Sequence, residues 1–184
     1  MTSLDMDFET EKEIEDEMNM MLDNMIIPMM EGTGSVELMG MLFPDNAHLP
    51  NKMKEDVLKS GQKACMIFPS AAVDSKEEWY EGISHLTKKM KIRNSFMISD
   101  TWIVEGAEDT TIAPSQHPDR TDAFVIHYVN TDINGILMRT AMMVCKYKLE
   151  EEKVVERERL FTVQSPDENI VSAFAEAVSN NDWV

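Results

Sequence analysis

The segment from Ile112 to Phe124 reads IAPSQHPDRTDAF and brings one histidine, two acids and one arginine together with two prolines. Pro118 fits the second position of a turn that begins at His117, and Pro114 fits the turn before it. Because His117 precedes a proline, its backbone should be extended. The spacing therefore predicts a stiff loop.

The polar side chains of this loop are suited to two different roles. His117, Asp119 and Arg120 on a stiff loop form a candidate anion or metal site, since Mn²⁺ and Zn²⁺ accept imidazole and carboxylate ligands. The same residues suit a structural loop in which Arg120 pairs with Asp119, Asp122 or Asp100. Loops carry function more often than core elements do, so both interpretations stay open.

Asp100 is the second candidate for chemistry. It lies in a strand-like run whose alternate positions are Phe96, Ile98, Asp100, Trp102 and Val104. If that face is buried, the carboxyl must be paired, hydrogen-bonded or protonated. A raised pKa would make Asp100 a candidate general acid or base, and Arg120 or Arg139 would be its structural partner otherwise.

Strong catalytic signatures are absent from the sequence. It contains no phosphate-binding GxxxxGK[ST], GxGxxG, HExxH or GxSxG pattern. The four histidines are His48, His85, His117 and His127, and none is spaced as part of a compact ligand set. Cys65 and Cys145 lie in apolar runs and are expected to be buried and reduced, with no spacing that suggests zinc. These patterns lean away from an enzyme and predict no cofactor and no bound metal.

The charge excludes several classes of partner. The 184 residues include 34 acidic and 17 basic side chains, for a net charge of −17. An excess of this sign disfavours nucleic-acid binding and anionic membranes, although an acidic inhibitor that imitates nucleic acid remains an alternative. No run approaches a membrane span, and the acidic N-terminus is unlike a signal peptide, so we expect a cytoplasmic protein.

The elements that must position these residues can be read from periodicity. Apolar residues from Glu9 to Glu31 follow one helix face, and Pro28 should kink or end that helix. Val36 to Phe43, with Gly40 as a bulge, and Lys63 to Phe68 read as strands. A short helix should end at Gly61, and Asp74 or Ser75 should cap a helix that runs to about Lys91.

The C-terminal half predicts a four-stranded antiparallel meander. Its strands are Ser95–Val104, Ala123–Val129, Ile136–Leu149 and Lys153–Val163, with a tight turn at Glu150–Glu152. A last helix, capped by Ser165 or Asp167, follows. We therefore predict an α+β fold, a mostly antiparallel sheet with helices packed mainly on one face. Residues 1–8 would be a disordered leader and residues 9–184 a single domain.

The third strand of the meander is apolar on both sides, which predicts that both sheet faces are covered. Helices can cover one face, and the N-terminal segment or a second copy of the chain can cover the other. The 17 methionines suit irregular, adaptable contacts. A well-filled monomer would explain the same pattern, but we expect a homo-oligomer.

Two stretches, SDTWIV (Ser99 to Val104) and PSQHPDR (Pro114 to Arg120), resemble a motif of an uncharacterised family of small bacterial and phage proteins. That motif runs roughly as Ser-Glu-Ala-Trp, a variable loop and Pro-Ser-Gln/Glu-His-Pro-Asp-Arg. The matching positions are Ser99, Trp102, Pro114, Ser115, Gln116, His117, Pro118, Asp119 and Arg120. Asp100 and Thr101 stand where the motif has Glu and Ala. The resemblance covers roughly residues 79–147 and implies no activity.

The sequence thus favours a non-catalytic accessory or assembly module that works through protein–protein contacts as a homo-oligomer, with an unknown protein partner. The alternative is a small hydrolase or a ligand- or metal-binding protein with its site around Asp100, His117, Asp119 and Arg120.

Overall fold

The computed structural model describes residues 10–45, 48–61, 64–105, 112–164 and 172–179. The expected leader (1–8) and the expected helix caps Ser165 and Asp167 lie outside these ranges.

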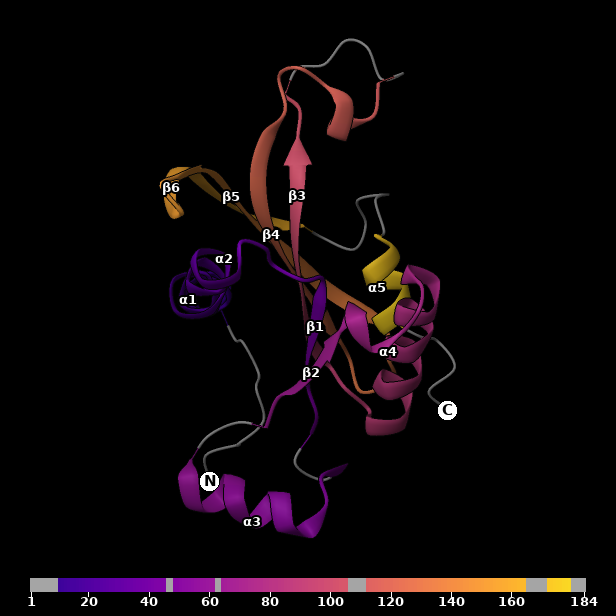
Figure 1. Cartoon of the computed structure of the whole chain (residues 1–184). Helices are drawn as coiled ribbons and strands as arrows, with labels where there is room; N and C mark the ends of the chain where they lie inside the picture. The colour runs from indigo at the N-terminus through magenta and orange to yellow at the C-terminus, as the bar shows by residue number, and fades with distance from the viewer. Residues whose placement is uncertain (1–9, 46–47, 62–63, 106–111, 165–171, 180–184) are drawn as a thin grey trace.

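One six-stranded antiparallel sheet forms the centre of the molecule (Figure 1), and its strand order is β2-β1-β3-β4-β5-β6. The strands are β1 (Met39–Phe43), β2 (Met66–Pro69), β3 (Asn94–Ile103), β4 (Thr121–Thr131), β5 (Leu137–Glu150) and β6 (Lys153–Gln164). The α+β class and the C-terminal meander, β3 to β6, are confirmed. The two N-terminal strands extend the same sheet from β3, which periodicity alone did not indicate.

Gly40 is not at a bulge, contrary to the prediction. It pairs in regular register with Phe68 on β2 and Met97 on β3. A Cβ atom built on Gly40 would lie 2.9 Å from Cδ1 of Ile83 and 3.5 Å from a ring carbon of Trp79. The glycine is therefore needed because a helix packs directly against its backbone.

The N-terminal helical segment consists of α1 (Glu11–Met21), the π-helical turn η1 (Leu22–Ile26) and α2 (Ile27–Thr33). Thr10 caps α1 through a reciprocal pair of hydrogen bonds with Glu13. The expected effect of Pro28 appears as the widened turn immediately before it, since proline lacks the N–H that an α-helix would use there. Gly34, with φ of 77°, ends α2.

This segment covers one face of the sheet, which we call the first face. Ile14, Met18 and Leu22 are fully buried there. They pack against sheet residues that include Phe96, Ile98, Phe124, Ile126, Tyr128, Met143 and Cys145. The predicted apolar stripe of this helix therefore packs on the sheet and forms part of the larger hydrophobic core.

Two further helices cover the opposite, second face: α4 (Lys76–Met90) and α5 (Ala173–Val178). Trp79 is fully buried in α4, donates its indole N–H to the carbonyl of Phe68 at 3.0 Å and stacks on Phe174 of α5. Helices thus lie on both faces of the sheet (Figure 1), whereas the sequence predicted helices mainly on one face. The difference arises because the N-terminal helical segment covers the first face, opposite α4 and α5.

The second face is not covered along its whole width. The helices α4 and α5 lie beside β1, β3 and β4, away from β6 (Figure 1). On β6, Val155 and Leu160 are 41% and 45% exposed. The last strand therefore presents apolar side chains to solvent on this side.

The remaining helices are peripheral to this arrangement. They are α3 (Asn51–Ser60) and the single 3₁₀ turns η3 (Ser70–Ala72) and η4 (Pro114–Gln116). Gly61, with φ of 66°, ends α3, and Ser75 caps α4, as the sequence predicted. The turn between β5 and β6 is tight, and Glu151 and Glu152 both have positive φ.

Candidate functional site

The loop after η4 is held together by its own hydrogen bonds. The Asp119 N–H donates to Nδ1 of His117 at 3.1 Å, and the Arg120 N–H donates to the His117 carbonyl at 3.3 Å. The Arg120 guanidinium donates to the carbonyl of Ser115. These contacts engage His117 and Arg120 within the loop itself.

Arg120 also fastens the loop to the sheet. Its guanidinium carbon lies 5.6 Å from the ring centroid of Trp102, within the range of a cation–π interaction. Trp102, 46% exposed, stands on β3 directly opposite Asp122 on β4. The two stretches SDTWIV and PSQHPDR are therefore in contact through the pair formed by Trp102 and Arg120.

Asp100 is not buried between apolar neighbours, because the covered part of the β3 face ends at Ile98 and Asp100 is exposed. Its Oδ1 accepts a hydrogen bond from the Tyr147 hydroxyl at 2.8 Å. Of the two predicted partners, Arg120 is bound as described above. Arg139, on β5, pairs with Asn130 of β4 and lies six residues, or about 20 Å, along β5 from Cys145. Cys145 lies in the same cross-strand row as Asp100, so Arg139 is far from the Asp100 carboxyl.

Asp100, Asp122 and Tyr147 form a small polar cluster at the end of the first face. The Tyr147 ring stacks on Phe124, with 4.0 Å between centroids and 5° between planes. Partial desolvation raises the pKa of the Asp100 carboxyl and the charge of Asp122 adds to this, while the hydrogen bond from Tyr147 opposes it. Burial, and then the bond to Asp100, raise the pKa of the Tyr147 hydroxyl.

The chemistry open to this cluster is limited. A carboxyl with a raised pKa can exchange a proton. In the part of the chain that the structure describes, no group of three or more His, Cys, Asp or Glu side chains is placed to hold a metal ion. Sequence reasoning missed Tyr147, whose only signal was its place in an alternating strand.

His127 is a buried, uncharged histidine on the second face. Its Nδ1 lies 3.2 Å from Oγ of Ser172, the residue that caps α5, and its ring lies 5.8 Å from Phe174. Burial lowers the pKa of His127 to about 4. These contacts give His127 a structural role, whereas His48 and His85 are exposed.

Both cysteines are free thiols, with Cys145 buried and Cys65 partly buried. Burial raises the pKa of Cys145 to about 12 and that of Cys65 to about 11. Neither side chain is therefore a thiolate at neutral pH, as a nucleophile would need to be.

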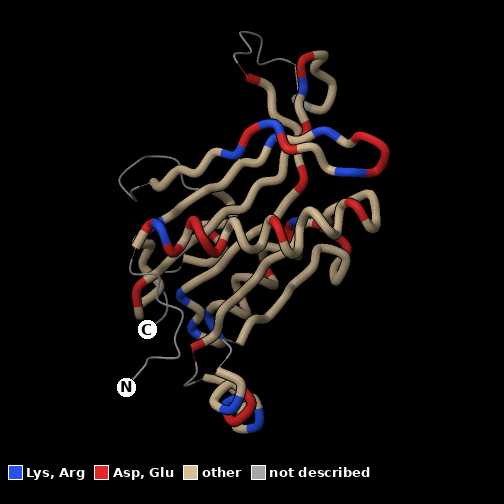
Figure 2. Tube along the Cα trace, turned by 90° about the vertical axis from the view of Figure 1, so that its left-hand side faces the viewer, with Lys and Arg blue, Asp and Glu red and all other residues tan. Residues whose placement is uncertain are grey.

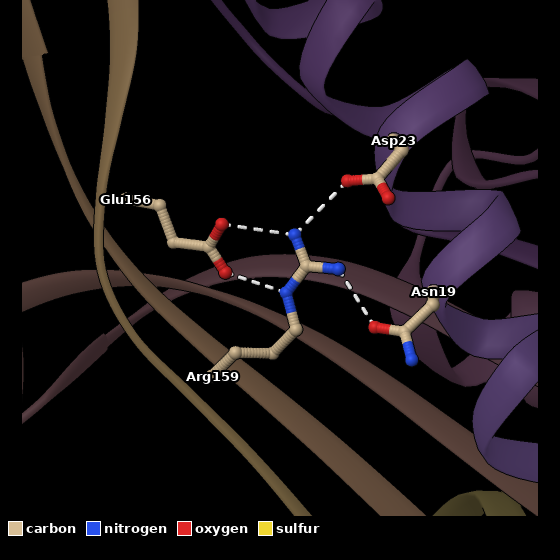
Figure 3. A network of polar contacts seen from close by, with 4 residues as sticks. All are labelled: Asn19, Asp23, Glu156 and Arg159. Carbon is tan, nitrogen blue, oxygen red and sulfur yellow. Dashed lines mark hydrogen bonds and ion pairs between the residues drawn. The ribbon is translucent and has the colours of Figure 1, made fainter.

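A second polar cluster joins β6 to the N-terminal helical segment (Figure 3). Arg159 of β6 donates to both carboxylate oxygens of Glu156, to Asp23 at 2.9 Å and to Asn19 at 2.7 Å. The hydrogen bonds to Glu156 and, after it, to Asp23 raise the pKa of Arg159. The guanidinium thus neutralises part of the acidic helix and holds it on the sheet.

Lys146 occupies the corresponding position on the second face. Its ammonium group donates to Glu105, beyond the end of β3, and to Glu158 of β6 at 2.6 Å. Hydrogen bonds to these two carboxylates raise the pKa of Lys146. Both clusters place charge at the junction of β5 and β6.

Two cavities lie away from all of these residues. One, of about 410 Å³, is an open groove between α4 and α5 that includes Tyr80, Glu81 and Glu176. The other, of about 260 Å³, lies between the end of α2 and the β5–β6 turn. Neither is lined by Asp100, His117, Asp119 or Arg120.

Comparison with known proteins adds no relative: no family model, curated protein or solved structure matches the chain. None of the helices within the described ranges combines the length and the apolar character needed to cross a membrane.

Proposed function

We propose that the protein is a non-catalytic accessory or assembly module that acts through protein–protein contacts as a homo-oligomer. The observation that carries the proposal is the β6 side of the sheet. There a 12-residue strand ends the sheet, and two of its apolar side chains, Val155 and Leu160, are exposed on the face that α4 and α5 leave open. A long edge strand of this kind is a template for association.

The hydrolase or ligand-binding alternative has less support. The raised pKa of Asp100 favours it, but Tyr147 binds that carboxyl, and the loop residues His117 and Arg120 are bound within their own loop. The two halves of that candidate site are linked through the contact between Arg120 and Trp102.

The oligomeric state tests the proposal. We expect light scattering after size-exclusion chromatography, at near-physiological salt, to give a mass that is a multiple of 21.0 kDa and that falls on dilution. A mass of one chain at every concentration, up to the limit of solubility, would contradict it.

A further inference from the structure

We infer that β6 pairs antiparallel with β6 of a second copy about a two-fold axis between Arg157 and Glu158, so that two six-stranded sheets become continuous. This inference rests on the proposed function and specifies its interface. The two edges of the sheet are unequal. β2 has four residues and ends at Pro69, which lacks an N–H, whereas β6 has 12 and spans about 40 Å. β6 is therefore the edge able to pair.

The side chains of β6 are sorted onto the two faces by a bulge. Register with β5 shifts between Lys146, which pairs with Glu158, and Tyr147, which pairs with Glu156, so Arg157 is the extra residue. Val154, Glu156, Arg159 and Phe161 consequently lie on the first face, where Val154 and Phe161 pack on the core. Val155, Glu158 and Leu160 lie on the second face.

The resulting pattern is complementary to itself. About the proposed axis, Glu156 faces Arg159 of the second copy, and Arg157 faces Glu158. Val155 faces Leu160. The Glu156–Arg159 and Val155–Leu160 pairs each join residues on the same face. A register displaced by one residue instead places Glu156 opposite Glu158 or Arg157 opposite Arg159. Opposite charges and apolar pairs across strands stabilise a sheet, and like charges destabilise it, so the pattern selects one register.

The backbone is compatible with that register. The N–H of Val154 donates to Oε1 of Glu31 at 3.0 Å and so does not point towards β5. The backbone N–H and C=O groups of successive residues point alternately towards β5 and away from it, and the bulge shifts this alternation by one residue. The backbone groups of Glu156 and Arg159 therefore also point away from β5. These two residues would form a hydrogen-bonded pair across the axis. Glu31 already occupies the Val154 N–H, which limits the ladder to Val155–Leu160.

Cross-linking tests the register directly. Residues opposite each other in a pair that is not hydrogen-bonded have Cβ atoms about 4.5–5.5 Å apart, close enough for a disulfide after a small adjustment. We expect a mixture of the variants Val155→Cys and Leu160→Cys to form a disulfide-linked dimer on mild oxidation, while each variant alone does not. A mixture of Val155→Cys with Thr162→Cys, which is displaced along the same face, is the matched control.

A charge reversal tests the same interface without a new thiol. Arg157→Glu places like charges opposite each other twice across the axis, so we expect the dissociation constant to rise about tenfold. Lys89→Glu makes the same change in net charge on α4, away from β6, and should leave the constant nearly unchanged. Circular dichroism of both variants would show that the fold is retained.

The outcomes separate this inference from the proposed function. An oligomer that shows neither the Val155–Leu160 cross-link nor sensitivity to Arg157→Glu would overturn the β6 interface and leave the homo-oligomer standing. A wild-type chain that is monomeric throughout would overturn both.

Discussion

At the scale of single residues, the candidate site is governed by partial desolvation, one hydrogen bond and one neighbouring charge. Asp100 is held by Tyr147 and destabilised in its ionised form by partial desolvation and by Asp122. Desolvation and the Asp122 charge raise the pKa of Asp100, and the hydrogen bond from Tyr147 lowers it. Desolvation is the largest of the three contributions. The cluster is therefore a place where protonation and folding are coupled.

We predict that a side-chain carbon NMR titration will find the pKa of Asp100 above that of an unperturbed aspartate. Tyr147→Phe should raise it further, because the variant removes the donor that favours the carboxylate. A carboxyl whose pKa is raised on folding binds more protons in the folded state. Stability from this group is therefore present below the unfolded pKa and is lost as pH rises through the folded one.

Asp100→Asn keeps an oxygen that accepts from Tyr147 but cannot ionise. Its stability relative to wild type should therefore increase as pH rises from below the unfolded pKa of the carboxyl to above its folded pKa. A difference that stays flat across this window, or a pKa of Asp100 below the ordinary value, would contradict the assignment.

At the scale of elements, the fold depends on close contact between α4 and the sheet. Ile83 is fully buried over Gly40, and Trp79 is fully buried beside it. A methyl group added at Gly40 would lie 2.9 Å from Cδ1 of Ile83, so this side chain would have to move within a close-packed interior.

We predict that Gly40→Ala will lower the free energy of unfolding by about 1–3 kcal/mol, the usual cost of overpacking a filled core. Denaturant unfolding followed by circular dichroism measures this. Gly32→Ala in α2 is the control. A Cβ at Gly32 meets nothing within 4 Å, so that variant should be neutral or stabilised by up to about 1 kcal/mol. An unchanged midpoint for Gly40→Ala would show that the Ile83 side chain moves aside at little cost in stability.

At the scale of the whole molecule, charge is the dominant feature. The acids of α1 lie over the first face (Figure 2), and the chain carries −17 in total. Two copies joined through β6 would place both acidic helices on the same side of the combined sheet. Long-range repulsion therefore opposes association, while the short-range pairs at the axis favour it.

We predict that association will strengthen as ionic strength rises from low to near-physiological values. The screening length falls from about 30 Å at 0.01 M to about 8 Å at 0.15 M, which removes repulsion between distant charges. Exposed ion pairs contribute only about 0–1 kcal/mol each and lose little. Sedimentation equilibrium over a salt series measures the trend, and dissociation by salt would show instead that the ion pairs dominate.

Several features of the fold followed from the sequence alone. The strands of the meander, the helix end at Gly61 and the helix cap at Ser75 each depend on residues close together in the sequence. Local periodicity and backbone preference decide such features before any packing occurs. The stiff, self-bonded loop at His117 was foreseeable as one of two interpretations for the same reason.

Tertiary structure decided which distant residues meet. Tyr147 rather than an arginine binds Asp100, β1 and β2 extend the sheet from β3, and the N-terminal helix covers the first face. The bulge at Arg157 sorts the side chains of β6. Strand order, register and the choice of face depend on contacts between segments far apart in the chain. Periodicity shows that a strand has two faces, but only packing determines what lies against each of them.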